Sequence, residues 1–206
     1  IAQGTLSAGA NYTLSFVPAN FTITPKPITI TANSGQAKTY GTNDPDTFTY
    51  TVPAGALVGT DALSGALSRI DGSDAGSYAI TQGTLSAGAN YTVMFVAANF
   101  TINKATLTVT ADNLSRGYGS ANPTFTAVIS GFVHCDTLEN SVAGAPDLTT
   151  TAGLTSPRGS YPIVVALHTL ASDNYTFSLV DGTLAVTKAT LTVTADAQNK
   201  LYGAAN

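Results

Sequence analysis

A block of sequence that recurs along the chain constrains its fold more than any other feature. Residues 1–24 match residues 80–103 at 19 of 24 positions, and a more diverged copy occupies 171–188. A second block, which carries a Tyr-Gly pair, recurs at 28–45, 107–123 and 191–206. The Tyr-Gly pairs begin at residues 40, 118 and 202, at spacings of 78 and 84 residues. One repeat therefore spans about 80 residues, and the chain is a tandem array.

The two blocks divide the chain into four predicted parts. These are the C-terminal part of a preceding repeat (1–27), two complete repeats (28–106 and 107–190) and the N-terminal part of a following repeat (191–206). Both ends cut through a repeat, so we expect the chain to be a piece of a longer array. A unit of this size buries only ~60–65% of its extended surface, so contacts with neighbouring repeats are expected to add stability. The incomplete segment 1–27 is expected to be ordered only beside further repeats or strands from another copy of the chain.

Within each repeat the side chains alternate with a period of two residues. Apolar residues such as Leu107, Val109 and Ala111 are separated by Thr108 and Thr110, which is typical of strands with one buried face. We therefore predict an all-β fold of small sandwich modules, with Ig-like and β-grasp-like topologies both open. Asp181-Gly182 predicts a hairpin turn. The best helical candidate is a short turn near Asp61–Leu67.

The buried face changes at each junction between repeats. Phe100 and Ile102 are even-numbered, whereas Leu107 and Val109 are odd-numbered. The same change occurs from Phe21/Ile23 to Ile28/Ile30 and from Leu184/Val186 to Leu191/Val193. A strand that changes its buried face is passing from one core to another. The linkers are thus only three or four residues long, which favours a rod-like array.

Composition excludes several classes of protein. With 44% hydrophobic and 10% charged residues, the chain is too apolar to be disordered. Its net charge of −4 argues against nucleic acid as a partner, which would require a basic surface. No apolar run approaches the ~18 residues of a membrane span. A single Cys excludes an internal disulfide.

Catalytic residue types are scarce, and the repeats provide a test for each candidate. Cys135 and His134 stand where the first complete repeat has Thr60 and Gly59. Neighbouring residues of a strand point to opposite faces, so a nucleophilic Cys–His pair is not expected. His168 aligns with Thr84 and is not expected to bind a metal. We predict no catalytic residues, no cofactor and no metal site, and hence no enzyme.

The acidic residues, the lysines near repeat ends and the Asn-x-Thr asparagines could each form a functional site or could serve only the fold. The densest acids, Asp44 with Asp46 and Asp71 with Asp74, could contribute to a calcium site, but we prefer turn-forming carboxylates. Asp61 and Asp136 recur at one repeat position and are read as turn or cap residues. The lysines near repeat ends are candidates for isopeptide bonds but are expected to be exposed: Lys26, Lys104 and Lys188. Five Asn-x-Thr triplets resemble glycosylation sites, but turn asparagines before strands are favoured: Asn11, Asn20, Asn90, Asn99 and Asn174.

Eight of the nine tyrosines fall at repeated positions: 12/91/175, 40/118/202 and 78/161. Such residues are expected to anchor the core through a hydroxyl that reaches the backbone. An alternative is that Tyr40 and Tyr118 pack at the junction between repeats. Exposed aromatic residues could instead bind glycans, and only Tyr50 and Phe132 are unique to one repeat.

The order of these motifs resembles the MBG domains of the Tyr-Gly-x type, which are tandem modules of large bacterial surface proteins and adhesins. The second complete repeat carries Leu107–Ala111, Tyr118-Gly119-Ser120-Ala121-Asn122-Pro123, Gly159-Ser160-Tyr161-Pro162-Ile163, Asn174-Tyr175-Thr176 and Leu184–Val186. The first carries Tyr40-Gly41-Thr42-Asn43-Asp44-Pro45 and Gly76-Ser77-Tyr78-Ala79-Ile80.

The resemblance implies an extracellular protein, on the bacterial cell surface or secreted, with a role in cell adhesion and biofilms. We expect a non-enzymatic stalk or spacer repeat of a large adhesin that extends an adhesive tip. The alternative is an adhesive module that binds glycan or mucin. Expected partners are neighbouring repeats, other copies of the chain through edge strands, and a host or matrix glycan, with no membrane span.

Overall fold

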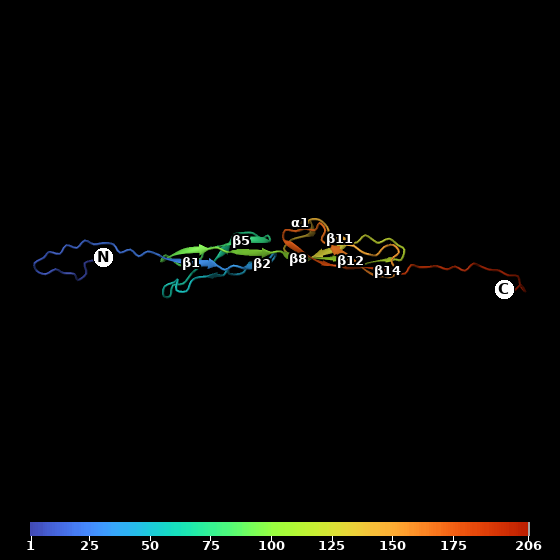
Figure 1. The fold of residues 1–206 in the computed structure, drawn as a ribbon, viewed down its shortest axis with the longest axis horizontal. Coiled ribbons are helices and arrows are strands. Elements are labelled where there is room, and N and C mark those ends of the chain that lie inside the picture. The colour runs from blue at the N-terminus through green and yellow to red at the C-terminus, as the bar shows by residue number, and fades with distance from the viewer. Residues whose placement is uncertain (206) are drawn as a thin grey trace. The chain divides into compact units, whose positions relative to one another are not determined.

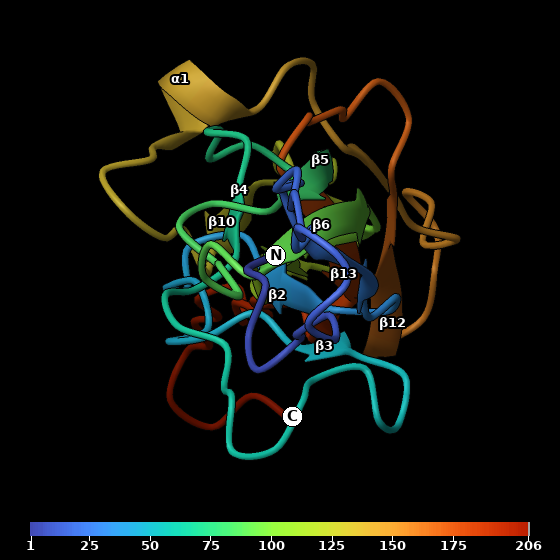
Figure 2. The ribbon, with the colours of Figure 1, turned by 90° about the vertical axis from the view of Figure 1, so that its left-hand side faces the viewer.

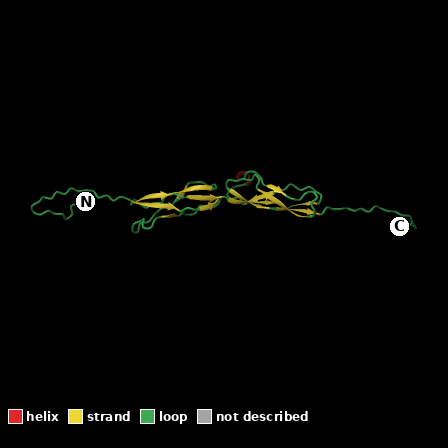
Figure 3. Ribbon diagram, viewed as in Figure 1, coloured by secondary structure: helices red, strands yellow, loops and turns green. Residues whose placement is uncertain are grey.

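The computed structural model of the chain describes residues 1–205 and is almost entirely β (Figure 3). Fourteen strands and one single-turn helix occur within these residues, which confirms the predicted all-β fold. By its contacts the chain divides into two compact units. The first comprises residues 1–38 and 43–102, and the second comprises residues 39–42 together with the chain from residue 103 onward.

The first unit contains two sheets, with strand orders β3-β1-β6 and β2-β7-β5-β4. Figure 1 labels β1 of the first sheet and β2 and β5 of the second. The strands are β1 (Lys26–Ala32), β2 (Ala37–Thr39), β3 (Tyr50–Thr51), β4 (Ser68–Arg69), β5 (Gly76–Thr81), β6 (Tyr91–Val96) and β7 (Asn99–Asn103). The central strand β1 pairs antiparallel with β3 and parallel with β6. The parallel register runs from Lys26 opposite Tyr91 to Thr31 opposite Val96.

The second unit repeats this topology with strand orders β10-β8-β13 and β11-β12-β14-β9. Its strands are β8 (Ala105–Ala111), β9 (Leu114–Gly117), β10 (Ala127–Ser130), β11 (Asp147–Thr149), β12 (Gly159–Ala166), β13 (Tyr175–Val180) and β14 (Gly182–Thr187). Strand β8 takes the place of β1, since it pairs antiparallel with β10 and parallel with β13. The helix α1 (Leu138–Ser141) is a single turn flanked by loops (Figure 2).

The strands bury alternate side chains, as their sequence period predicts. In β1, Ile28, Ile30 and Ala32 are buried, while the threonines between them are only half-buried. In the second unit, Val109 of one sheet and Ile163 and Leu184 of the other belong to a single apolar cluster. Burial of alternate residues from both sheets thus produces the core of the unit.

Burial also confirms the predicted change of face between β7 and β8. Phe100 and Ile102 are buried in β7, and Leu107 and Val109 are buried in β8. Ile28 and Ile30 are buried as well, but Phe21 and Ile23 before them are exposed. Leu191 and Val193 are likewise exposed. In the described residues, only the junction between β7 and β8 therefore has buried apolar side chains both before and after the predicted change of face.

The hairpin prediction at Asp181-Gly182 is wrong. Strands β13 and β14 flank these residues but belong to different sheets, so the chain crosses the core at this point. Asp181 accepts a hydrogen bond from the amide of Val165. A Cβ at Gly182 would lie 2.7 Å from the carbonyl oxygen of Ala111. Glycine is therefore required here by close packing and not by a tight turn.

The helical turn considered for Asp61–Leu67 is not formed, since these residues contain only a bridge and a bend. The helix α1 occupies the equivalent place in the second unit, where Leu138 corresponds to Leu63. There Asn140 accepts a hydrogen bond from the amide of Thr137, which satisfies a donor at the start of the turn. Gly65 of the first unit corresponds to Gly144, since a Cβ on either would meet the matching carbonyl oxygen, of Thr84 or of Thr169. The first unit therefore lacks the residues that form the helical turn between Leu138 and Gly144.

Residues 1–25 and 188–205 contain no strand and appear as green loops in Figure 3. Nearly every residue of 1–25 is exposed, including Tyr12, Phe21 and Ile23. The near-identical sequence at 80–103 forms β6 and β7 within the first unit. The difference is that β6 pairs with β1 and β7 pairs with β5.

This contrast predicts a difference in hydrogen exchange between two copies of one sequence. In the 206-residue chain, the amides of Leu14 and Phe21 should exchange rapidly, because they lack strand partners. Those of Val93 and Phe100 should be strongly protected. Amide exchange followed by NMR measures both in one sample. Equal protection at the paired positions would contradict the expectation that 1–27 requires further strands.

Candidate functional site

The most distinctive polar group in each unit joins a buried tyrosine to an aspartate, and we call it the Tyr–Asp cluster. In the second unit the Tyr175 hydroxyl donates to Oδ2 of Asp136 at 2.7 Å and accepts from the amide of Val133 at 3.0 Å. In the first unit, Tyr91 donates to Asp61 at 2.7 Å and accepts from the amide of Val58 at 2.8 Å. The recurring aspartates therefore hold tyrosine hydroxyls.

The second-unit Tyr–Asp cluster contains one further tyrosine. Tyr40 belongs to the second unit although its sequence lies in the first repeat. It is 7% exposed, and its hydroxyl donates to Oδ2 of Asp136 at 2.9 Å. Its ring meets those of Tyr175 and His134 edge-on, at centroid distances of 5.4 and 5.5 Å, an arrangement favoured by aromatic quadrupoles.

Tyrosines at the third repeated position also reach the backbone. The hydroxyl of Tyr78 donates to the carbonyl oxygen of Asp74, and that of Tyr161 donates to the carbonyl oxygen of Pro157. With Tyr91 and Tyr175, these contacts confirm the predicted backbone anchoring for four of the eight repeated tyrosines. Tyr118 is 49% exposed, and Tyr12 and Tyr202 are exposed as well.

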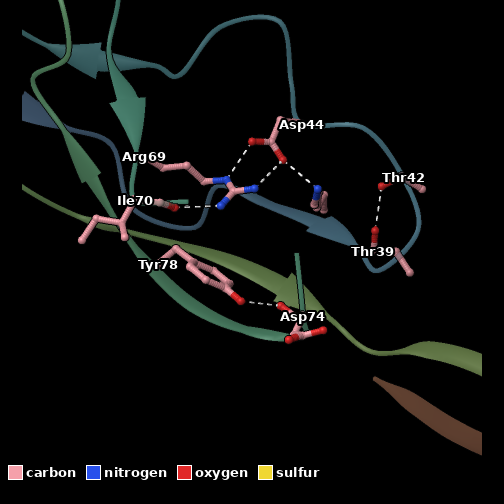
Figure 4. A network of polar contacts seen from close by, with 8 residues as sticks. Thr39, Thr42, Asp44, Arg69, Ile70, Asp74 and Tyr78 are labelled. Atoms are coloured by element: carbon pink, nitrogen blue, oxygen red, sulfur yellow. Dashed lines mark hydrogen bonds and ion pairs between the residues drawn. The ribbon is translucent and has the colours of Figure 1, made fainter. Parts of the chain in front are cut away.

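Asp44 is held by two cations of the first unit (Figure 4). Arg69 donates through Nε at 2.7 Å and Nη2 at 3.1 Å, and Nζ of Lys38 lies 2.7 Å from Oδ1. The hydrogen bond from Arg69 is the main cause that lowers the pKa of Asp44 to about 2. The Arg69 guanidinium also lies over the rings of Tyr78 and Phe100, at 5.1 and 5.5 Å.

The second unit replaces the ion pairs with an arginine whose hydrogen-bond acceptors are uncharged. Arg116 occupies the place of Lys38, and Asn122 that of Asp44. Arg116 is 7% exposed and donates to Asn122 Oδ1 and to the carbonyl oxygen of Gly153. Both arrangements close the loop after the Tyr-Gly pair, which indicates a structural role for these charges.

Asp44 is thus ion-paired, which removes the strongest member of the suggested calcium group. Asp46, Asp71 and Asp74 are exposed. Within residues 1–205, no three His, Cys, Asp or Glu side chains gather closely enough to hold a metal ion.

The histidines occupy backbone positions that glycine fills in the first unit. His134 has φ of 55° where Gly59 has 60°, and His168 has φ of 49° where Gly83 has 57°. The alignment of His168 with Thr84 was therefore wrong by one residue, because Thr84 corresponds to Thr169, whose hydroxyl makes the same contact. Cys135 is exposed, and His134 packs on Tyr40, so the two do not form a nucleophile and base.

The lysines and asparagines near the repeat boundaries make backbone contacts. Lys26 and Lys104 donate to the carbonyl oxygens of Gly55 and Ser172, and Lys188 is exposed. Asn90 and Asn174 directly precede β6 and β13 and accept from the first residues of the paired strands, in agreement with turn asparagines. Asn99 opens β7, and Asn11 and Asn20 lie in the strandless segment.

The aromatic residues unique to one repeat are not freely exposed. Tyr50 lies half-buried in β3. Phe132 is half-buried and contacts the ring of Tyr175 at a centroid distance of 5.9 Å. The described residues also include no helix that could cross a lipid bilayer.

The lowered pKa of Asp44 predicts acid sensitivity of the first unit. The ion pair stabilises the fold above the unfolded pKa of 3.8, and this stability is lost as the pH falls through about 2. Since the Asp44 side chain is 34% exposed, solvent screening limits the effect to ~1 kcal/mol. Denaturant unfolding between pH 5 and pH 2 should show a weaker pH dependence for Asp44→Asn. Asp46→Asn is the matched control, and equal slopes for both variants would contradict the prediction.

The second-unit Tyr–Asp cluster predicts alkaline sensitivity. Burial, with the Asp136 hydrogen bond, raises the pKa of Tyr175 to about 12 from 10.0. The stability due to neutral Tyr175 is present below pH 10 and is lost as the pH rises towards 12, by up to ~2–3 kcal/mol. Tyr175→Phe should remove this dependence and cost ~1–2 kcal/mol near neutral pH. Tyrosinate absorbance and unfolding measurements provide the test, with Tyr161→Phe as control; an unchanged alkaline profile would refute it.

Comparison with known proteins gives one family. Two segments, residues 28–101 and 107–185, match the family described as MBG domain (YGX type), and together they cover more than half of the chain. A search of curated proteins found no significant match. MBG domains are repeat modules of bacterial surface proteins. The repeated Tyr-Gly pairs, the identical strand orders of the two units and these two matches lead to one conclusion: the chain belongs to the MBG domain family of the Tyr-Gly-x type.

Proposed function

We propose that the chain is a non-enzymatic stalk segment of a large bacterial adhesin, which carries tension outside the cell and extends an adhesive tip. The supporting observation is how the terminal strands of each unit are paired. The chain enters the first unit through β1 and leaves it through β7, directly after β6. Strand β1 is parallel to β6 over the full register from Lys26 to Thr31.

Parallel terminal strands resist tension well when force acts along them. Pulling the start of β1 and the end of β6 apart loads all the hydrogen bonds of the ladder together, in shear. In an antiparallel terminal hairpin, the same pull would open the bonds one at a time. The second unit has the same design in β8 and β13, paired from Ala105–Tyr175 to Thr110–Val180.

The last strand of the second unit is secured on both sides. Strand β14 pairs with β12 from Gly159–Val186 to Ile163–Gly182, and with β9 from Leu184–Leu114 to Thr187–Gly117. A force applied at Thr187 therefore pulls along β14 and loads the hydrogen bonds of both of its ladders in shear. Such a mechanical module needs no acid, base or metal.

Single-molecule force spectroscopy tests the proposal on the 206-residue chain held at its two ends. We expect two abrupt unfolding events, each releasing about 25 nm of chain at ~3.4 Å per residue. A variant with Thr108→Pro in β8 should weaken only the event of the second unit, because proline disrupts the ladders around this central strand. Gradual extension without abrupt events would contradict a load-bearing role.

The alternative, a glycan- or mucin-binding module, is tested on the same protein with a glycan array and immobilised mucin. A stalk segment should show no saturable binding. Specific binding that is lost in Tyr50→Ala would favour the adhesive alternative over the stalk.

A further inference from the structure

The chain passes between its two units at three places. It enters the second unit at Thr39, returns to the first after Thr42 and crosses again after Ile102. Residues 39–42, which we call the Tyr40 turn, are therefore a piece of the second unit whose neighbours on both sides in the sequence belong to the first. The position of this turn thus depends on residues of the first unit.

The Tyr40 turn has a well-defined backbone conformation. The Thr42 amide donates to the carbonyl oxygen of Thr39 at 3.1 Å, and the Thr42 hydroxyl donates to the same oxygen at 2.7 Å (Figure 4). Gly41 has a φ of 88°, as the third residue of a type II turn requires. Tyr40 is consequently held at the tip of a tight turn.

The first unit anchors the Tyr40 turn at both of its ends. Before the turn, strand β2 pairs with β7. After it, Asp44 forms an ion pair with Lys38 at 2.7 Å and accepts a hydrogen bond from Arg69 of β4 at 2.7 Å (Figure 4). These three side chains close the base of the loop that presents the turn. Since β2, β4 and β7 belong to one sheet, both anchors exist only when this sheet is formed.

The second unit uses the tip of the turn as part of its interior. Tyr40 is 7% exposed, and its hydroxyl is one of two that donate to Asp136, the other being that of Tyr175. Gly41 lies directly on Val133, since a Cβ on the glycine would be 2.4 Å from Cγ2 of the valine. Loss of the turn would remove a donor from Asp136 and uncover the ring of Tyr175 and the side chain of Val133.

We propose that the Tyr40 turn couples the stability of the second unit to the folded state of the first. When the first unit unfolds, β2 and Asp44 no longer anchor the turn. The second unit must then order residues 39–42 by itself, against the conformational entropy of a free chain. The proposal concerns stability without applied force, so it goes beyond the stalk function and stands without it.

Native-state amide exchange followed by NMR tests the proposal on the 206-residue chain. The amide of Val109 in β8 reports the opening of the second unit, and that of Ile30 in β1 reports the first. Tyr40→Ala should raise the opening equilibrium at Val109 by about tenfold, the value of one hydrogen bond to a charged group.

Unfolding the first unit should have a similar effect on the second. Ile30→Asp buries a charge in the core of the first unit and should raise the opening equilibrium at Val109 by about tenfold as well. Met94→Asp, at an exposed position of β6, is the matched control and should leave exchange at Val109 unchanged. Unchanged exchange at Val109 in Ile30→Asp, with Ile30 itself unprotected, would overturn the proposal.

A milder variant tests the anchor while the first unit stays folded. Asp44→Ala opens the base of the loop and should raise the opening equilibrium at Val109 by ~2–5-fold, the range expected for a partly exposed ion pair. The contacts of Asp44 with Lys38 and Arg69 lie within the first unit, so a direct effect on Val109 is not expected. Asp46→Ala removes an exposed carboxylate nearby and should have no effect.

Combining these variants with Tyr40→Ala identifies the route of the coupling. Without the Tyr40 side chain, neither Asp44→Ala nor Ile30→Asp should raise the opening equilibrium at Val109 any further, because the effects of residues that act through one contact are not additive. If either substitution has the same effect with and without Tyr40, the coupling does not pass through the turn and the proposal is overturned.

Discussion

The architecture of each unit depends on the parallel pairing of its first strand with its sixth. Parallel strands cannot be joined by a tight turn, because the chain must return to the same end of the sheet. The residues between β1 and β6 therefore leave the first sheet, contribute most of the second and come back. The pairing also places β1 between two neighbours, which buries Ile28, Ile30 and Ala32 in the centre of the unit.

Polar interactions then complete units that are too small to rely on apolar burial alone. Every fully buried side-chain nitrogen or oxygen in the described residues has a hydrogen-bond partner. The two units solve the same problem differently, with the ion-paired Asp44 in one and the Arg116–Asn122 contact in the other. Because both arrangements occur in the same fold and close the same loop, we interpret these residues as structural and not as a binding site.

The buried tyrosines join segments that are distant in the sequence. Tyr91 and Tyr175 are tied to their own strands and aspartates, whereas Tyr40 is a residue of one repeat that completes the second unit.

The strands, their buried faces and several tyrosine contacts could be predicted from the internal repeats and from the two-residue alternation of apolar side chains. The alternation of Leu107, Val109 and Ala111 with threonine predicts a strand and its buried face, because the side-chain direction alternates along any strand. The even-to-odd change after Ile102 predicts where the buried face switches, and burial confirms it. The repeated positions of Tyr78 and Tyr161 predict anchors for the same reason, since an identical local path offers the hydroxyl the same carbonyl.

Only the tertiary structure showed which strands pair and which side chains meet when they are distant in the sequence. Asp181-Gly182 has the composition of a hairpin turn, yet it crosses between sheets, because β13 and β14 find better partners in β8 and β12. The trio of Lys38, Asp44 and Arg69 carries no sequence signal, since its members meet only after β2 and β4 join one sheet. Sequence by itself determined the repeat, the strands and their buried faces, which are local and periodic. The sheet order and the place of Tyr40 in the second unit arise from packing between segments that are distant in sequence, which no local pattern encodes.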